Sequence, residues 1–430
     1  MTDAAACVLP SFPGSTPPDW IRRFLAAGGR GLVLFAYNCD DLPTLTAALR
    51  AEREDVLLAI DEEGGDVTRL EWRTGSSYPG GAALGAVDDP RLTEDVSAAI
   101  AADLARAGVN WDFAPVADVN VPGNPVIGTR AFGSDPALVA RHVGAAVRGL
   151  QRDHVAACAK HFPGHGSTVE DSHLALPALV GPLEDGLEPF RAAVAAGVQS
   201  IMTAHIKVHA DAATLDRTIV DGLLRGELGF AGVVVSDALE MKGVSARHDL
   251  ADAAVLAVEA GCDALIVGHD VGEEDTMRIV DALAARVDAE RLAEAAGRVA
   301  RLAGWARPAA GEAPDVRGAA RRAVSVEGDV SFPGTPRIVE LRPVANIAAG
   351  EAAHGLAGAA VVREGEPVPE ADVYVVRDVH RHPWMEAADR PGAVVVEIGL
   401  PVWRPRHARG FVATYGGGRA SLEAAEALLA

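Results

Sequence analysis

Short runs of apolar residues alternate with longer amphipathic stretches between residues 6 and 305. The runs are continuous, as in the three valines at 233–235, which is typical of strands covered on both faces. Short strands separated by longer helices predict a parallel sheet with crossover helices. The predicted strands lie at residues 6–9, 31–35, 56–60, 109–113, 155–159, 198–203, 232–236 and 263–267.

The stretches between these runs have the periodicity of helices. At 92–104 a leucine, valine or isoleucine recurs every fourth residue, and Gly108 follows as a stop signal. A similar stripe at 183–194 precedes Gly197. Eight strand-and-helix units in this span predict an α/β fold, a (β/α)8 TIM-type barrel, with a doubly wound open sheet as the alternative.

The pattern changes after Trp305. Residues 307–314, Arg-Pro-Ala-Ala-Gly-Glu-Ala-Pro, have no apolar period and predict a linker. We therefore expect a catalytic barrel domain at 1–306 and a small α/β sandwich domain at 315–430. The second domain is predicted to contain strands at 337–341, 359–362, 373–376, 393–398 and 410–414 and a closing helix at 422–429.

Composition and charge limit the partners. The 430 residues include 39 Lys and Arg and 60 Asp and Glu, which gives a net charge of −21. Such a chain repels nucleic acid and anionic membranes, so we expect neither as a partner. The four cysteines are widely spaced and no apolar run reaches the ~18 residues of a membrane helix. These features favour a cytoplasmic protein with reduced thiols.

Several predicted barrel strands end in, or lead to, ionisable residues. The carboxyl ends of barrel strands meet at one rim, which is where catalytic groups of such barrels lie. We therefore expect one convergent site at this rim. The residues concerned are Asp61, Asp118, Lys160, His205, Asp237, His269 and Asp270, of which Asp118, His205, His269 and Asp270 are expected to have supporting roles.

One segment is long enough to be specific. Residues 160–166 read Lys-His-Phe-Pro-Gly-His-Gly, and Asp-Ser-His follows at 171–173. The segments 60–65, Ile-Asp-Glu-Glu-Gly-Gly, and 124–130, Asn-Pro-Val-Ile-Gly-Thr-Arg, agree with it in order and spacing, as does Ser-Asp at 236–237. From residue 9 to about 302 the sequence resembles the family 3 glycoside hydrolases, specifically their bacterial β-N-acetylglucosaminidase branch. Glu62 and Ala238 depart from the common Gln and Asp, at positions without chemistry in that family.

The resemblance implies a retaining mechanism with Asp237 as the nucleophile. A carboxylate at a strand end can be fixed against C1 of a sugar and form a covalent glycosyl-enzyme. From the local sequence alone, Asp237 could equally cap a following helix. The resemblance further implies that His173, oriented by Asp171, is the acid and base, and the alternative for His173 is a solvated loop histidine.

The resemblance assigns five charged or polar residues to sugar binding. Such donors and acceptors suit a ligand rich in hydroxyl groups. From the residues alone, Arg69 and Arg130 could instead form surface ion pairs. Lys160 directly follows an apolar run, and lysine is rarely buried without a partner, so we expect it to be functional. The assigned residues are Asp61, Arg69, Arg130, Lys160 and His161.

The expected activity is hydrolysis of terminal β-linked GlcNAc from peptidoglycan-derived fragments, by a monomer or homodimer that uses no cofactor and no metal. Phosphorolysis of the same glycosides is the main alternative. A β-glucosidase, a non-catalytic sugar-binding protein and a zinc-dependent barrel hydrolase are further alternatives, the last because of His161, His165 and His173.

The C-terminal domain is expected to supply no catalytic residue. Its Tyr-Gly-Gly-Gly segment at 415–418 lacks the Gly-Lys-Ser/Thr ending of a phosphate-binding loop, which favours a turn. We expect this domain to pack beside the active-site mouth or to support a dimer.

Overall fold

The computed structural model describes residues 2–268, 270–309, 311–344 and 355–430. All eight predicted strands of the first sheet are present, with bounds shifted by a few residues at most. They are β1 (Val8–Pro10), β2 (Gly31–Val33), β3 (Leu57–Ile60), β4 (Trp111–Asp112), β5 (Ala156–Phe162), β6 (Ser200–Thr203), β7 (Val233–Ser236) and β8 (Leu265–Val267).

The strands follow one another around a barrel. β2 to β7 pair in chain order, each parallel to the next. A parallel bridge between Val235 and Ala264 joins β7 to β8, and β8 pairs in parallel with β1. The Leu9 side chain of β1 lies against Gly31 of β2. Because β8 returns to β1, the barrel prediction is confirmed and the open doubly wound sheet is wrong.

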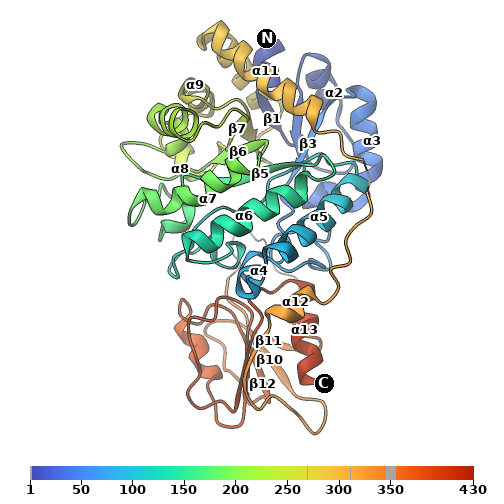
Figure 1. The fold of residues 1–430 in the computed structure, drawn as a ribbon, viewed down its shortest axis with the longest axis vertical. Coiled ribbons are helices and arrows are strands. Elements are labelled where there is room, and N and C mark those ends of the chain that lie inside the picture. Colours follow the sequence, from blue (N-terminus) through green and yellow to red (C-terminus); the bar gives the residue numbers. More distant parts are fainter. Residues whose placement is uncertain (1, 269, 310, 345–354) are drawn as a thin grey trace.

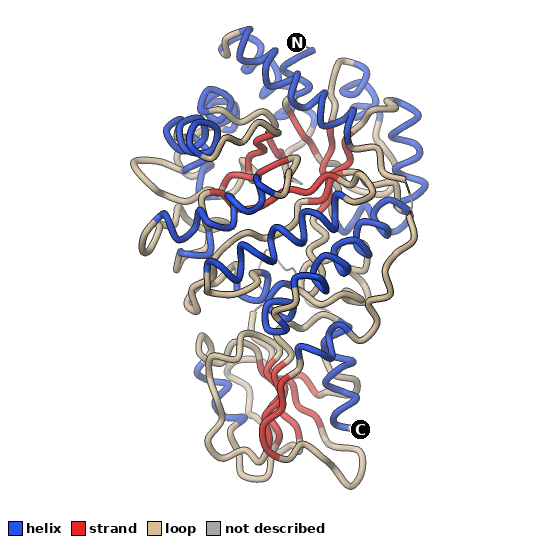
Figure 2. Tube along the Cα trace, in the orientation of Figure 1, coloured by secondary structure: helices blue, strands red, loops and turns tan. Residues whose placement is uncertain are grey.

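Helices surround this sheet, as Figures 1 and 2 show. The two helices predicted from leucine and valine stripes are α5 and α7, and Gly108 and Gly197 follow them with φ of 79° and 80°, a conformation that glycine adopts without strain. The helices are α1 (Thr2–Ala6), α2 (Asp19–Ala26), α3 (Leu42–Glu52), α4 (Gly81–Val87), α5 (Pro90–Arg106), α6 (Pro136–Gln151), α7 (Leu183–Ala195), the π-helix η5 (Thr218–Glu227), α8 (Lys242–Ser245), α9 (Leu250–Ala260), α10 (Glu273–Arg286) and α11 (Ala289–Trp305).

Alternate residues of each strand face two apolar layers. In β3, Leu57 and Ala59 belong to the cluster inside the barrel, whereas Leu58 and Ile60 pack in the layer under the helices. Val299 and Leu302 of α11 pack against the interior cluster, and Figure 1 shows α11 at the end of the barrel away from the second sheet. The opposite rim is therefore the one available for a site.

The C-terminal unit is built on a second sheet of order β11-β10-β12-β13-β14-β9. Five strands lie at the predicted apolar runs and are parallel to their neighbours, and α13 (Arg419–Leu429) closes the chain as expected. The sixth strand, β9, pairs antiparallel with β14. It was not predicted, because it is mostly exposed and its sequence has no apolar run. The strands are β9 (Ser325–Gly328), β10 (Ile338–Leu341), β11 (Ala360–Val362), β12 (Val373–Val376), β13 (Val394–Glu397) and β14 (Gly410–Ala413).

Apolar layers cover both faces of the second sheet. Leu422 and Leu429 of α13 pack with Val373 on one face, and Met385 of the 3-10 helix η6 (Pro383–Ala388) packs with Tyr374 on the other. The short helix α12 (Ala319–Ala323) precedes this sheet and contacts α4 of the barrel. The domain boundary at 307–314 stays a prediction.

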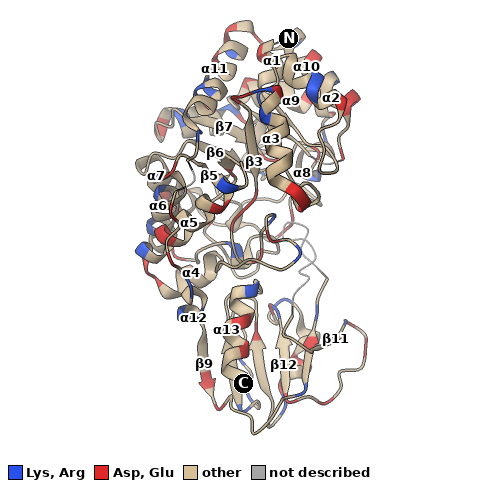
Figure 3. Ribbon diagram, turned by 90° about the vertical axis from the view of Figure 1, so that its right-hand side faces the viewer, with Lys and Arg blue, Asp and Glu red and all other residues tan. Residues whose placement is uncertain are grey.

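The second sheet lies next to the rim loops of the barrel. Arg377, after β12, forms an ion pair with Asp66, after β3, at 2.8 Å. The backbone N–H of Ala420 in α13 donates to the Ser76 carbonyl at 3.1 Å. Figure 3 shows the first turn of α13 directed at the barrel. Of the two expected arrangements, packing beside the rim is the one observed within the chain.

None of the helices in the described ranges is both long and apolar enough to cross a membrane. The four cysteines are free thiols, three of them buried and Cys39 partly exposed.

Candidate active site

Asp237 lies directly after Ser236, the last residue of β7, at the barrel rim. Its carboxylate accepts a hydrogen bond from the backbone N–H of Ala238 at 2.8 Å. The next helix, α8, begins only at Lys242, so the helix-cap interpretation of Asp237 is wrong. The side chain is therefore free of a structural role in helix initiation.

Three histidines determine the charge of Asp237. Burial raises the pKa of Asp237, but His205, His161 and His173 lower it by more than burial raises it. The pKa therefore lies below the ordinary aspartate value. The carboxyl group is consequently ionised at neutral pH. His161 lies near the end of β5, His173 follows β5 and His205 follows β6, so groups from two neighbouring strands and the residues after them act on this carboxyl group.

Asp171 and His173 form the hydrogen-bonded pair that the sequence led us to expect. The Asp171 carboxylate accepts from both the Nδ1 atom of His173, at 2.7 Å, and its backbone N–H, at 2.8 Å. This fixes the imidazole and leaves Nε2 as the ring atom for proton transfer. Burial raises the pKa of Asp171, but the hydrogen bonds from His173 lower it below its ordinary value. The His173 side chain is 24% exposed, so it is reachable but not freely solvated.

The loop that carries this pair is tied to the preceding motif. The Nε2 atom of buried His165 lies 2.7 Å from the Ser172 hydroxyl. Burial, together with His161, lowers the pKa of His165 to about 4, so this ring stays neutral and serves as a hydrogen-bonding link. The Asn124 amide donates to the carbonyls of His165, Gly166 and Thr168 at 2.9, 3.2 and 3.0 Å.

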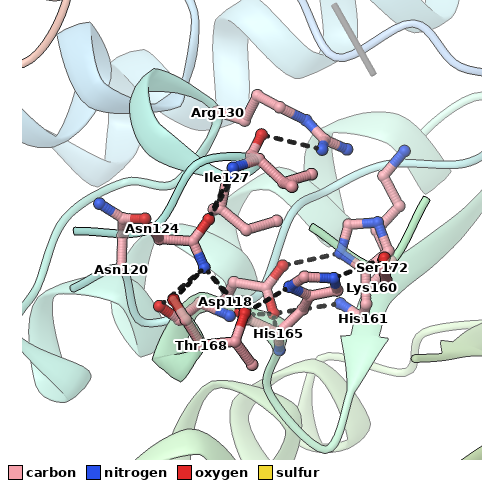
Figure 4. A network of polar contacts seen from close by, with 12 residues as sticks. Asp118, Asn120, Asn124, Ile127, Arg130, Lys160, His161, His165, Thr168 and Ser172 are labelled. Carbon is pink, nitrogen blue, oxygen red and sulfur yellow. Dashed lines mark hydrogen bonds and ion pairs between the residues drawn. The ribbon is translucent and has the colours of Figure 1, made fainter. Parts of the chain in front are cut away.

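Asp118 lies at the centre of the network in Figure 4. One carboxylate oxygen is 2.7 Å from Nδ1 of His161, and the other accepts the backbone N–H groups of His165 and Gly166 at 2.6 and 3.2 Å. Asp118 therefore orients His161 and shapes the glycine-rich loop at 164–166. The supporting role predicted for it agrees with this geometry.

Lys160 is almost fully buried between two carboxylates. Its Nζ atom lies 2.6 Å from Asp61 and 2.7 Å from Glu63. Burial alone would lower the lysine pKa, but these two partners raise it above its ordinary value. Arg69 lies on the other side of Asp61, at 3.8 Å. The expected lysine, aspartate and arginine therefore form one cluster.

Arg130 pairs with Glu63 through two contacts of 2.9 and 2.7 Å. The side chains are only 8% and 6% exposed, so the surface ion pair considered for Arg130 is wrong. Burial raises the Glu63 pKa, but Arg130 and Lys160 lower it well below the ordinary value. Glu63 was not among the predicted site residues, although its place between Asp61 and Gly64 in the motif could have signalled it.

Three further rim residues were expected to have supporting roles. Asp270 is exposed, and His269 lies outside the described residues. His205 is buried and its Nε2 donates to the Ala238 carbonyl at 2.9 Å, next to Asp237.

Within the described ranges, no group of three or more His, Cys, Asp or Glu side chains is arranged to hold a metal ion. His161, His165 and His173 instead have separate partners.

Comparison with known proteins agrees with this geometry. Residues 30–302 match the N-terminal domain of glycosyl hydrolase family 3. The chain belongs to this family of glycoside hydrolases. A β-hexosaminidase of Methylococcus capsulatus is 36% identical over 296 residues, which cover 64% of this chain and 87% of that one. A β-hexosaminidase of Bordetella avium is 38% identical over 254 residues, 55% of this chain and 73% of that one.

A solved structure resembles the whole chain. The family 3 β-N-acetylglucosaminidase of a Paenibacillus species has a TM-score of 0.87 and 29% identity, and the match covers 100% of this chain and 96% of that one. The family resemblance seen in the sequence is thus confirmed.

Proposed function

We propose that this family 3 member hydrolyses terminal β-linked N-acetylglucosamine with retention of configuration. Asp237 is the nucleophile, and His173 with Asp171 is the acid and base. The observation that carries the proposal is the convergence, at one rim, of an ionised carboxylate with an imidazole oriented by a second carboxylate. The β-hexosaminidases at 36–38% identity support the choice of sugar.

In the first step, a carboxylate oxygen of Asp237 attacks C1 of the sugar and forms a covalent glycosyl-enzyme. The bond between C1 and the glycosidic oxygen breaks, and its electron pair stays on that oxygen. Protonated His173 gives the Nε2 proton to this leaving oxygen. The Asp171 carboxylate at Nδ1 stabilises the charged ring before the transfer.

In the second step, the neutral Nε2 atom of His173 takes a proton from water while the water oxygen attacks C1. The bond between C1 and Asp237 breaks, and its electrons return to the carboxylate. The lowered pKa of Asp237 makes the carboxylate a better leaving group. Two inversions at C1 give retention.

Sugar binding falls to Asp61, Arg69, Arg130, Lys160 and His161 in this proposal. Their positions support it, because Asp61 and Arg69 lie on either side of the turn after β3, and Glu63 between them orients two of the cations. A buried charged cluster leaves a wrongly configured sugar with unpaired polar groups, which is a strong source of specificity.

We infer hydrolysis rather than phosphorolysis. A neutral His173 repels neither water nor phosphate, so the acid and base leave both open. The cations Lys160 and Arg130 are already paired with Asp61 and Glu63, which weakens their attraction for another anion. The net charge of −21 adds no global attraction. Peptidoglycan-derived fragments as natural substrates, and a cytoplasmic location, stay predictions.

The experiment compares an aryl β-GlcNAc glycoside with the corresponding β-glucoside, with and without millimolar-range phosphate. We expect release of GlcNAc, preference for the GlcNAc glycoside and no effect of phosphate. Asp237→Ala is the matched control and should lose turnover while remaining folded, with partial recovery when azide is added as an external nucleophile. GlcNAc-1-phosphate as the main product would overturn hydrolysis, and preference for the glucoside would overturn the sugar.

A further inference from the structure

The turn after β3, residues 61–70, carries Asp61, Glu63 and Arg69, and the C-terminal unit contacts its tip. Asp66 at this tip is nearly buried, with 4% of its side chain exposed. One carboxylate oxygen accepts from Nη2 of Arg377 and from the backbone N–H of Gly417, both at 2.8 Å. The other accepts from the Thr129 hydroxyl at 2.6 Å. One carboxylate therefore joins two rim loops of the barrel to the C-terminal unit.

The glycines around this carboxylate allow the two units to touch backbone to backbone. A Cβ atom at Gly418 would lie 2.7 Å from the Gly65 carbonyl oxygen. Within the barrel, a Cβ atom at Gly65 would lie 2.6 Å from Cα of Gly80, so the turn that Gly418 contacts is itself too closely packed for a side chain. The Tyr-Gly-Gly-Gly segment at 415–418 is thus part of a contact surface against the Gly-Gly turn at 64–65.

Both loops that Asp66 joins carry charged residues of the site. Glu63 lies three positions before Asp66 and pairs with Lys160 and Arg130. Thr129, which donates to Asp66, directly precedes Arg130. A displacement at Asp66 would therefore move both partners of the Glu63–Arg130 pair.

We propose that Arg377 is a positioning residue for the sugar site: through Asp66, the C-terminal unit sets the placement of the loops that carry Asp61, Glu63 and Arg130. This inference rests on the proposed function for its kinetic consequences. The C-terminal unit then affects sugar binding through the placement of these barrel loops.

The test uses the full chain with Arg377→Met, and Arg322→Met as the matched control. Arg322 also bridges the two units, at 2.9 Å from Asp89, but Asp89 caps α5 and lies outside the two site loops. Arg377→Met should raise KM for an aryl β-GlcNAc glycoside about tenfold, with a smaller change in kcat. Arg377→Lys keeps the charge and should restore most of the wild-type KM. Arg322→Met should leave KM unchanged.

One further measurement and one further variant keep the outcomes distinct. Hydrogen–deuterium exchange at residues 61–80 should become faster in Arg377→Met and stay unchanged in Arg322→Met, whether or not the wild-type chain cleaves a GlcNAc glycoside. If Arg377→Met does not fold, Gly417→Ala disturbs the same contact, because its Cβ would lie 2.5 Å from Nη2 of Arg377. Equal effects of the two arginine variants, or unchanged exchange at 61–80, would overturn the inference. An inactive wild type would instead overturn the proposed function.

Discussion

The barrel and the C-terminal sheet both direct carboxyl ends of parallel strands at their junction. Asp66 follows β3 of the barrel, whereas Arg377 and Gly417 follow β12 and β14 of the second sheet, and these residues meet. The two rims therefore have the same origin in strand geometry. They differ in how their buried carboxyl groups are satisfied.

Glu63 at the barrel rim and Glu397 at the end of β13 illustrate the difference. Glu63 lies between Arg130 and Lys160, and these cations keep its pKa well below the ordinary value. Glu397 accepts backbone N–H groups of Asp378 and Gly399 at 2.8 and 2.7 Å. Burial, together with Asp378, raises its pKa to about 8. The first group is ionised at neutral pH, and the second is mostly protonated.

The comparison shows that strand ends alone do not make an active site. Both rims place polar groups where loops can present them. At the barrel rim, Arg130 and Lys160 balance the buried Glu63 carboxylate, which provides fixed charges for a polar ligand. At the second rim Glu397 instead accepts the backbone N–H groups of Asp378 and Gly399 and so orders the turns after β12 and β13.

Among variants that should retain some turnover, the largest expected effect comes from His173→Ala at the barrel rim. Loss of the proton donor should lower kcat/KM for a GlcNAc disaccharide about a thousandfold, because its leaving oxygen needs the proton. An aryl glycoside with a good leaving group should lose much less. Rates for a series of leaving groups measure this. Equal losses for good and poor leaving groups would remove His173 from the acid role.

Glu63→Gln keeps the size of the side chain and removes its charge. Arg130 then loses its buried counter-charge, and Lys160 keeps only Asp61 of its two partners. We expect kcat/KM for an aryl β-GlcNAc glycoside to fall about a hundredfold. Steady-state kinetics on folded protein checks this, with circular dichroism as the control for folding. Wild-type kinetics would show that the paired charges do not position the sugar site.

Glu397→Gln is the matched substitution at the other rim and should leave kcat/KM unchanged. In the unfolded chain this group ionises near pH 4.5, but in the folded chain only near pH 8, so its contribution to stability is lost as pH rises through that window. The variant should therefore be more stable than wild type at pH 9, by at most roughly 5 kcal/mol, and differ little at pH 4. Thermal unfolding at both pH values measures this. Higher stability only at low pH would contradict the assignment.

The sequence could predict the barrel strands because their signals are local. Continuous apolar runs mark strands buried on both faces, and glycines such as Gly108 mark the helix ends. The sequence did not predict β9 because it is an exposed edge strand, whose pairing with β14 depends on residues about eighty positions away. The Asp237, Asp171 and His173 roles followed from the family resemblance, and they stay predictions until tested.

By itself, the sequence determined the barrel, the order of the rim residues and the family. The tertiary structure decided which charges face one another. Glu63 and Arg130 are 67 residues apart, and Asp66 and Arg377 are 311 apart, so no local pattern contains these pairs. Their burial matters because ion pairs shielded from water interact strongly, whereas the same residues on a surface contribute little. That is why the ion pairs of Glu63 with Arg130 and of Arg377 with Asp66 could be recognised only once the chain was folded.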